Sequence, residues 1–418
     1  MLDIKFIREN KDLVSGAARK KRVKFDVGKL LAVDEKRRSL IAEVDNLRKL
    51  HKEGSEGVSS LQGKEKEDLI FKLKDEKDKL SDKETELRAV EAEFEELMLM
   101  VPNIPDPSVP EGESDADNQE IRKFGEAKKS AVDYFSIMKS FDMVDLDRGA
   151  KVSGFRGYFL KGDAAMLSIA IWQFTLSFLR SKGFTPLLAP ALVRRENMLG
   201  TGWFPQAEED VYKMQDDVYL SGTAEVPVMG YHRDEILTEE ELPKKYVAFS
   251  PCFRREAGSY GKDAKGIFRV HEFYKVEQVV LCRADHQESV KWHEELTKNS
   301  EEIMQAFEIP YRVVLNCGAD LGLGQVKKYD IEGWVPSEGR YRETHSSSYF
   351  HDFQTRRLNI KYRDSSGGLH FAHSLNNTAI ATPRFLEAFL ENHSQPDGSV
   401  KIPNALVKYF GEEEIRHM

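Results

Sequence analysis

The sequence predicts an α+β protein: an N-terminal arm of two antiparallel helices, then a domain in which helices pack on an antiparallel sheet. Three observations predict this class. Residues 26–100 lack proline, are rich in charge and carry apolar residues at intervals of seven. Four prolines then fall within residues 101–120. Beyond them, residues 121–418 alternate short β-branched or aromatic runs with amphipathic segments, as antiparallel sheets with packed helices do.

Length and charge limit the kind of protein. A chain of 418 residues exceeds one ordinary hydrophobic core, so we expect an N-terminal domain (1–100), a linker (101–120) and a C-terminal domain (121–418). The 62 basic and 71 acidic residues give a net charge of −9. That balance argues against a dedicated nucleic-acid-binding protein, which is usually basic, although it permits a local grip on RNA.

The arm is predicted from two series of apolar residues. The first follows three-four spacing and is interrupted by Arg37: Leu30, Val33, Leu40, Val44 and Leu47. The second recurs every seven residues: Leu73, Leu80, Leu87 and Phe94. Glycines and serines at 51–63 break the helix between them, so two helices fold back into a coiled-coil hairpin roughly 40 to 50 Å long. A coiled coil between two chains is the alternative interpretation.

Two short features flank the arm. The basic run Arg19–Lys24 is either a solvated face or a local RNA contact. The prolines of residues 101–120 predict an extended linker, followed by acidic residues.

Cysteine and hydropathy patterns indicate the compartment. Cys252, Cys282 and Cys317 stand far apart, without the spacing of a zinc site or of a disulfide framework. We expect small buried side chains in a reducing environment. No run of about 18 uncharged apolar residues predicts a membrane span, and the N-terminus lacks a leader pattern. The expectation is a cytoplasmic protein without zinc.

The C-terminal domain is predicted to be mixed. An amphipathic helix over 164–182 would place these residues on one face: Leu167, Ile171, Phe174 and Phe178. Residues 245–256, 271–282 and 311–316 have the composition of short strands. Neither G-x-G-x-x-G nor a P-loop pattern occurs, which argues against a Rossmann sheet and a P-loop site.

One predicted strand hairpin carries candidate chemistry. Arg254, Arg255 and Glu256 end its first strand, residues 268–281 form its second, and the loop between them contains two lysines and three glycines. Guanidinium groups bind phosphate oxygens in pairs, Glu256 could accept from an adenine amino group, and Phe273 could stack on a purine. An ordinary charged surface hairpin is the alternative interpretation.

The same segment resembles a known family motif. Residues 253–278, FRREAGSYGKDAKGIFRVHEFYKVEQ, resemble motif 2 of the class II aminoacyl-tRNA synthetases, and in particular that of the seryl-tRNA synthetases. The segments 1–14 and 101–118 resemble the family's opening and linker, and GFTPLLAPALV resembles motif 1, with Pro190 at its fixed proline.

Three further segments extend the resemblance in family order. SGTAEVP at 221–227 is similar to the serine-recognising T-x-E, and residues 342–363 to the segment that holds ATP and its metal. Residues 369–393 resemble motif 3, with Arg384 as its arginine. The resemblance implies a class II catalytic domain over 121–418 and a tRNA-binding domain over 1–100.

The resemblance also implies site residues. The two arginines expected to act in catalysis are Arg254 and Arg384. The ATP-binding set would be Arg254, Arg255, Glu256, Val270, Phe273, Glu343, Thr344, His345, Ser346 and Arg384. The serine-binding set would be Thr223, Ala224, Glu225, Glu277 and Thr378. Mg²⁺ bound with ATP would be held by Glu343 and Ser346, and no zinc is implied.

The implied reaction joins L-serine to ATP as seryl-adenylate and passes the seryl group to the 3′-terminal adenosine of serine tRNA. Selenocysteine tRNA is a further candidate acceptor. Neither step needs a protein nucleophile, so none of the eleven histidines is assigned a role. The arm would reach the long variable arm of the tRNA, with candidate contacts at Arg48, Lys49 and Lys52, and the chain would form a homodimer.

Several positions depart from the family pattern. His345 replaces a serine and Tyr349 stands where asparagine is common. Asn377 and Ala379 replace glycines, and Pro383 replaces the glycine before the motif 3 arginine. Losing glycines and gaining a proline constrains the backbone next to Thr378.

Two other functions fit parts of the sequence. An enzyme that loads an amino acid onto a carrier protein would share the fold, although the long arm argues against it. An inactive paralogue acting as an RNA-binding factor would lose its pocket residues, whereas this chain retains them: Arg254, Glu256, Glu277, Glu343 and Arg384.

Overall fold

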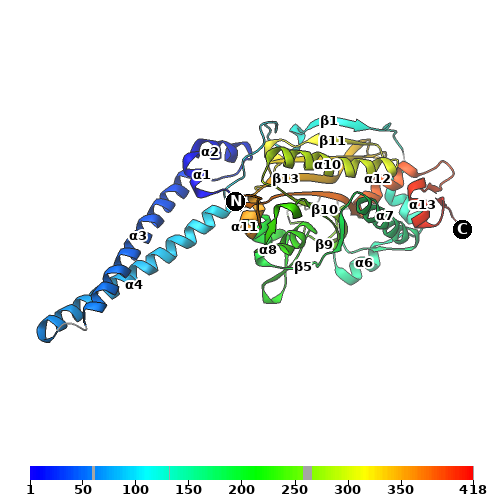
Figure 1. Cartoon of the computed structure of the whole chain (residues 1–418). Coiled ribbons are helices and arrows are strands. Elements are labelled where there is room, and N and C mark those ends of the chain that lie inside the picture. The colour runs from blue at the N-terminus through cyan, green and yellow to red at the C-terminus, as the bar shows by residue number, and fades with distance from the viewer. Residues whose placement is uncertain (59–61, 131, 258–265, 418) are drawn as a thin grey trace. The chain divides into compact units, whose positions relative to one another are not determined.

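The computed structural model describes residues 1–58, 62–130, 132–257 and 266–417, and these residues form two compact units. One comprises Asp3–Arg19 and Val23–Pro102, and we call it the helical unit. The other comprises Met1–Leu2, Lys20–Arg22 and Asn103–Met418, and we call it the sheet unit. Figure 1 labels the elements of both units along the chain.

The helical unit consists of four helices: α1 (Ile4–Glu9), α2 (Lys11–Lys20), α3 (Val27–Gly57) and α4 (Gly63–Leu99). The long pair, α3 and α4, pack on each other and form the arm. Four ion pairs link the two helices: Lys29–Glu93, Lys36–Glu86, Glu43–Lys83 and Arg48–Glu84. The first three pairs rise in residue number along α3 and fall along α4, so the two helices are antiparallel, as the sequence predicts.

The seam of the arm contains few fully buried apolar side chains: Leu30, Leu40 and Val44 in α3, and Leu73 and Val90 in α4. Arg37, which interrupts the apolar series, stacks its guanidinium 4.2 Å from the ring centre of Phe94. The predicted interruption at 51–63 is too long, because Gly54 and Gly57 both lie inside α3. At Gly54 the helices are so close that a β-carbon would lie 2.6 Å from Leu73 Cδ2, so glycine there serves helix packing.

The sheet unit is built on an eight-stranded sheet whose neighbouring strands are antiparallel except for the edge pair β9 and β4. In spatial order its strands are β1 (Gln119–Phe124), β11 (Tyr311–Leu315), β12 (Lys327–Val335), β13 (Arg340–His351), β16 (His373–Thr382), β10 (Glu272–Cys282), β9 (Lys244–Phe253) and β4 (Thr185–Leu188). This arrangement, together with the arm, confirms the predicted α+β class.

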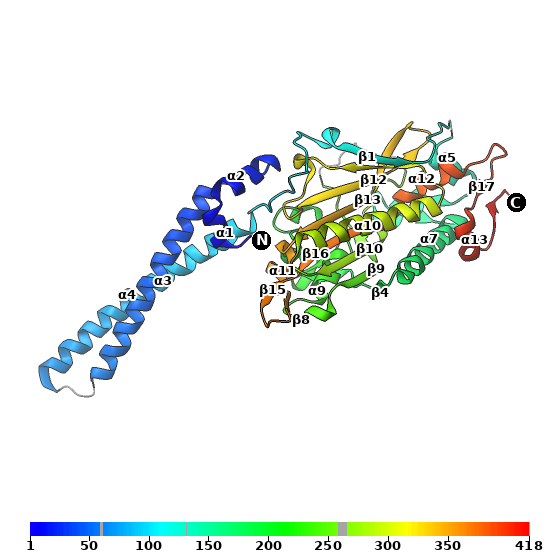
Figure 2. The same cartoon turned by 45° about the horizontal axis from the view of Figure 1, so that its top comes forward.

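Three helices pack on one face of the sheet: α7 (Gly162–Ser181), α10 (His286–Ala306) and α12 (Arg384–His393). Figure 2 shows α10 lying over the strands. Among the described helices only α7 is long and apolar enough to cross a membrane, and Leu167, Ile171 and Leu179 bury its inner face in the core. The predicted helix over 164–182 is therefore present, with Phe174 and Phe178 partly buried beside that core.

Shorter elements complete the sheet unit. Its other helices are α5 (Tyr134–Ser140), α6 (Leu146–Ser153), α8 (Arg195–Thr201), α9 (Glu225–Tyr231), α11 (Phe353–Leu358) and α13 (Asn404–Phe410). Two small sheets have two strands each: β2 (Val144–Asp145) with β3 (Phe159–Leu160), and β17 (Val400–Lys401) with β18 (Glu414–Ile415). Two others have three strands each. In one, β7 (Val218–Leu220) lies between β5 (Leu192–Arg194) and β6 (Tyr212–Lys213); in the other, β14 (Lys361–Arg363) lies between β8 (Ile236–Thr238) and β15 (Leu369–Phe371).

Residues Lys20–Arg22 belong to the sheet unit although they lie between two helices of the helical unit. Lys21 is buried, and its ammonium donates to three backbone carbonyls at 3.1, 2.8 and 2.5 Å: those of Gly322, Leu323 and Gln325. Burial lowers the pKa of Lys21 well below its usual value. The basic run Arg19–Lys24 is therefore not a uniformly solvated face.

The linker region is fastened to the sheet unit rather than free. Asn103 donates from Nδ2 to the carbonyls of Gly324 and Phe350, and Asp106 accepts from the Tyr349 hydroxyl at 2.7 Å. All three cysteines are free and buried.

Candidate active site

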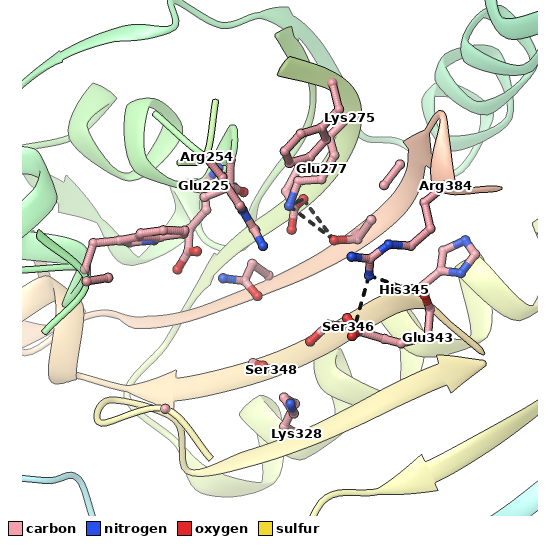
Figure 3. A pocket seen from close by; sticks show the side chains of 18 of the residues that line it. Glu225, Arg254, Lys275, Glu277, Lys328, Glu343, His345, Ser346, Ser348 and Arg384 are labelled. Carbon is pink, nitrogen blue, oxygen red and sulfur yellow. Dashed lines mark hydrogen bonds and ion pairs between the residues drawn. The ribbon is translucent and has the colours of Figure 1, made fainter. Parts of the chain in front are cut away.

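The face of the large sheet opposite α10 carries a cavity of about 430 Å³. Side chains from β10, β12, β13 and β16, from the segment after β9 and from the start of α9 line it. Along β10 the lining positions alternate: Phe273, Lys275 and Glu277 face the cavity, whereas Val276 lies in the core and Gln278 contacts α10. Figure 3 shows the cavity side chains.

An acidic cluster of four residues lies in this cavity: Thr223, Glu225, Glu277 and Thr378. Glu225 opens α9 and is buried, and its Oε1 accepts from Gln354 Nε2 at 2.6 Å. Burial, reinforced by the negative charge of Glu277, raises the pKa of Glu225 to about 7. The Thr378 hydroxyl donates to Glu277 Oε2 at 3.2 Å. The structure thus brings four of the predicted serine-binding residues together, while buried Ala224 does not line the cavity.

Lys275 is a cavity residue that the sequence analysis missed. Its Nζ lies 2.7 Å from Glu277 Oε2 and 3.3 Å from the Thr378 hydroxyl. The two-residue period of β10 could have found it, because Phe273 and Glu277 were both assigned and Lys275 lies between them on the same face.

A cationic cluster shares the cavity: Arg254, Arg269 and Arg384. Arg254 directly follows β9, and its guanidinium lies 5.5 Å from the ring centres of both Trp203 and Phe273. Its buried Nε has no hydrogen-bond partner among the described residues. A buried, incompletely paired guanidinium fits an anionic ligand. Trp203 is a further residue that the sequence analysis missed.

The strands of this hairpin are shorter than predicted. The first ends at Phe253 and the second begins at Glu272 rather than Phe268. The amide of Ile267, which precedes the predicted strand, donates to the Tyr134 hydroxyl. Most of the predicted glycine-rich loop, residues 258–265, lies outside the described residues.

The predicted adenine contacts lie around this hairpin. Glu256 follows β9 with a φ of 53° and pairs with Arg269 at 3.2 Å. Phe273 and buried Val270 line the cavity. Arg255, by contrast, is exposed and lies outside the lining.

Arg384 begins α12, 3.7 Å from a carboxylate oxygen of Glu343. Burial lowers its pKa, and the nearby Glu343 opposes this shift. Its guanidinium stacks 4.5 Å from the ring centre of Phe268, and Arg342 stacks on the same ring at 3.8 Å. This contact places the motif 3 arginine in the cavity beside an aromatic ring.

Residues 343–346 occupy β13. Ser346 pairs with Asp330 of β12, and the register shifts at Thr344, which is bulged. His345 is buried, its Nδ1 lies 2.7 Å from the Thr344 hydroxyl, and its ring contacts Phe385 of α12. His345 therefore contacts α12 through its ring and also lines part of the cavity.

The predicted metal ligands are chemically suited to Mg²⁺. Glu343 and Ser346 offer carboxylate and hydroxyl oxygens at the cavity, the hard donors that Mg²⁺ prefers. In the described part of the chain no group of three or more histidine, cysteine or acidic side chains could hold a metal by itself. This fits an ion that is bound jointly by few carboxylates and by substrate phosphates.

Lys328 and Asp330 form a second unpredicted pair, at 3.3 Å on β12. Lys328 lines the cavity, and burial raises the pKa of Asp330 to about 6 against the opposing effect of Lys328. The two-residue period of a strand places Lys328 and Asp330 on the same face of β12, as it does Lys275 and Glu277 on β10.

Most departures from the family pattern point away from the cavity. Asn377 Oδ1 accepts from Gln278 Nε2 and from the Ser300 hydroxyl behind the sheet, and Ala379 is buried in the core. Tyr349 is buried and donates to Asp106. Pro383 lines the cavity beside Arg384.

Comparisons with known proteins agree with this geometry. Residues 1–105 match the model of the seryl-tRNA synthetase N-terminal domain, and residues 209–393 that of the tRNA synthetase class II core domain (G, H, P, S and T). A serine–tRNA ligase of Deinococcus radiodurans is 48% identical over 419 residues, which cover 99% of each chain. This chain belongs to the serine–tRNA ligase family.

Solved structures of the serine–tRNA ligase family match over the whole chain. Seryl-tRNA synthetase from Pyrococcus horikoshii complexed with ATP has a TM-score of 0.91 and 40% identity and covers 100% of both chains. The serine–tRNA ligase from Naegleria fowleri in complex with AMP has a TM-score of 0.87 and 31% identity over 100% of this chain and 99% of its own. These relatives confirm serine–tRNA ligation, and because the match includes the arm, it argues against carrier-protein loading.

Proposed function

We propose that this chain activates L-serine with ATP, forming seryl-adenylate and pyrophosphate, and then transfers the seryl group to the 3′-terminal adenosine of serine tRNA. The observation that carries the proposal is a single cavity lined by both the acidic and the cationic cluster. A substrate ammonium needs negatively charged partners and a polyphosphate needs positively charged ones. This cavity supplies both kinds of partner close to one another.

Serine would bind in the acidic cluster. Its ammonium suits the carboxylates of Glu225 and Glu277, and its hydroxyl suits the hydroxyl of Thr378. A site that hydrogen-bonds a substrate hydroxyl rejects analogues without one by about 10⁴- to 10⁵-fold. Threonine keeps the hydroxyl and is the harder competitor.

ATP would bind in the cationic cluster. Arg254 would hold the α-phosphate, Phe273 would stack on the adenine, and Glu256 would accept from the adenine amino group. Arg384 would hold the far end of the triphosphate. Glu343 and Ser346 would hold Mg²⁺, which supplies positive charge that neutralises the phosphate oxygens.

Catalysis would rest on positioning and charge. The serine carboxylate attacks the α-phosphorus in line with the leaving pyrophosphate, and Arg254 stabilises the charge that develops on the phosphoryl oxygens. A ribose hydroxyl of the terminal adenosine then attacks the seryl carbonyl and releases AMP. No side chain of the enzyme forms a covalent bond in either step.

The arm and the assembly complete the proposal. We propose that the arm contacts the long variable arm of serine tRNA through its shape and backbone, with Arg48, Lys49 and Lys52 as candidate contacts, and that the enzyme acts as a homodimer. Free thiols at all three cysteines support action in the reducing cytoplasm.

The decisive experiment is ATP–pyrophosphate exchange measured with each of the twenty amino acids in turn. Serine should support exchange, and Arg254→Ala should fold normally yet lose it. Exchange with a different amino acid, or none with serine, would refute the assignment. Transfer of serine to a carrier protein but not to tRNA would refute the second step alone.

A further inference from the structure

Lys275 is a buried lysine beside the carboxylates of the acidic cluster, and no role has so far been given to it. Its side chain is 8% exposed and that of Glu277 3% exposed, so water screens their 2.7 Å contact very little. The Lys275 ammonium also reaches the Thr378 hydroxyl at 3.3 Å. Figure 3 shows these contacts as dashed lines.

The two carboxylate oxygens of Glu277 differ in their hydrogen-bond and ion-pair partners. Lys275 and Thr378 both engage Oε2, at 2.7 and 3.2 Å. None of the described residues lies within hydrogen-bonding distance of Oε1, so this oxygen remains available to a ligand in the cavity. A carboxylate held by one oxygen presents the other in a fixed direction.

Lys275 also sets the charge of the cluster. Glu225 and Glu277 contribute two negative charges when ionised, and Lys275 contributes one positive charge. The Cys252 thiol also interacts electrostatically with Lys275, Glu277 and Arg254, and burial raises its pKa. The carboxylates and the lysine alone leave one negative charge, which a single substrate ammonium neutralises.

We propose that Lys275 is a specificity-determining residue that orients Glu277 and balances its charge, so that Glu277 Oε1 and Thr378 recognise the ammonium and hydroxyl of serine. The inference rests on the proposed placement of serine in the acidic cluster. Removing the lysine would leave two unbalanced carboxylates and would raise the pKa of Glu225 further, because the charge of Lys275 opposes that shift. The pair, protonated at Glu225, would then bind an ammonium weakly.

Pyrophosphate exchange with Lys275→Met tests this role. The KM for serine should rise about 10- to 100-fold, as expected for loss of a partner from a buried charged pair, while the KM for ATP stays within about twofold. Raising the pH from 7 to 8.5 should lower the KM for serine again, because the extra proton is lost. The preference for serine over alanine should fall, since Glu277 and Thr378 are no longer aligned.

Three other variants make the result specific. Lys275→Arg keeps the charge and should recover most of the serine affinity without the pH dependence. Lys245→Met removes a half-buried lysine from the neighbouring strand β9, where its Nζ contacts the Lys182 carbonyl outside the cavity, and should leave both KM values unchanged. If Lys275→Met fails to fold, Lys275→Gln removes the charge and retains a hydrogen-bond donor.

Glu277→Gln separates the two proposals. If Glu277→Gln raises the KM for serine and Lys275→Met does not, the role of Lys275 is refuted and the serine site stands. If neither variant changes the KM for serine, the placement of serine is itself refuted. An equal rise of both KM values in Lys275→Met would also overturn the inference, because it would indicate a general structural role.

Discussion

Burial makes the ionised form of Glu225 unfavourable in the enzyme without substrate. It lies in the cavity wall, accepts one hydrogen bond from Gln354 and has a pKa of about 7 rather than 4.5. The folded state therefore binds this proton more tightly than the unfolded chain does. The stability that this proton provides is complete below about pH 4.5 and is lost as the pH rises toward 7.

Glu225→Gln should consequently stabilise the ligand-free enzyme at pH 8 and abolish serine-dependent exchange. A shift from 4.5 to about 7 corresponds to an upper limit on the order of 3 kcal/mol, and the gain over wild type should vanish by pH 4.5. Thermal unfolding across this pH range measures the effect. Glu209→Gln, at an exposed position, controls for the loss of a charge, and an equal gain there would contradict the prediction.

At single positions the sequence predicts which residues belong to the site better than it predicts the surroundings of their side chains. The resemblance placed Glu277 and Arg384 in the site, and strand alternation would have added Lys275. The pair Lys328–Asp330 was missed, although its two-residue spacing fits one face of a strand, because residues 327–335 were not among the predicted strands. The direction of His345 depends on the bulge at Thr344, which no sequence pattern predicts.

Among the elements, the arm depends least on apolar burial. Its helices are joined by four ion pairs at exposed or half-exposed positions, and exposed pairs contribute less than about 1 kcal/mol each. The stacking of Arg37 on Phe94 places a guanidinium where a heptad would have an apolar residue. Arginine there covers apolar surface with its stem as well as with its planar head.

Arg37→Ala should therefore loosen the arm, although it removes a charged residue from an apolar seam. We expect a loss of about 1 kcal/mol in local stability, seen as roughly fivefold faster hydrogen exchange of α3 and α4 amides. Lys49→Ala, at an exposed position of α3, should leave exchange unchanged. Equal acceleration by both substitutions would mean that stacking makes no contribution.

Helices with a regular apolar spacing could be predicted from the sequence, whereas the residues at which helices and strands begin and end could not. Three-four spacing located the first arm helix, heptad spacing the second, and apolar spacing α7. The interruption of the arm was overestimated, because close packing against Leu73 keeps Gly54 helical. The start of β10 was placed too early, at Phe268 rather than Glu272. Tertiary partners decide such boundaries.

In the whole molecule, serine activation and tRNA binding should be separable. The acidic and cationic clusters lie entirely within the sheet unit, whereas the proposed tRNA contacts lie in the helical unit. Each function can therefore be impaired while the other is measured.

Replacing Leu31–Met98 with a short glycine linker should leave serine-dependent pyrophosphate exchange largely intact and reduce tRNA charging by orders of magnitude. In the full chain, the KM for tRNA should rise steeply with salt as counterions are displaced from the phosphates, while the KM for serine changes little. Charging that survives the deletion would show that the arm does not grip the tRNA.

The path of the chain through Lys21 has a consequence for dissecting this enzyme. A fragment starting at residue 103 would contain every strand of the large sheet and yet lack the ammonium that binds the Gly322, Leu323 and Gln325 carbonyls. Unpaired buried carbonyls cost about 1–3 kcal/mol each, and this loop forms part of the cavity wall. The minimal activating enzyme is therefore not a contiguous stretch of sequence: it must be assembled from two segments, one of which precedes the arm.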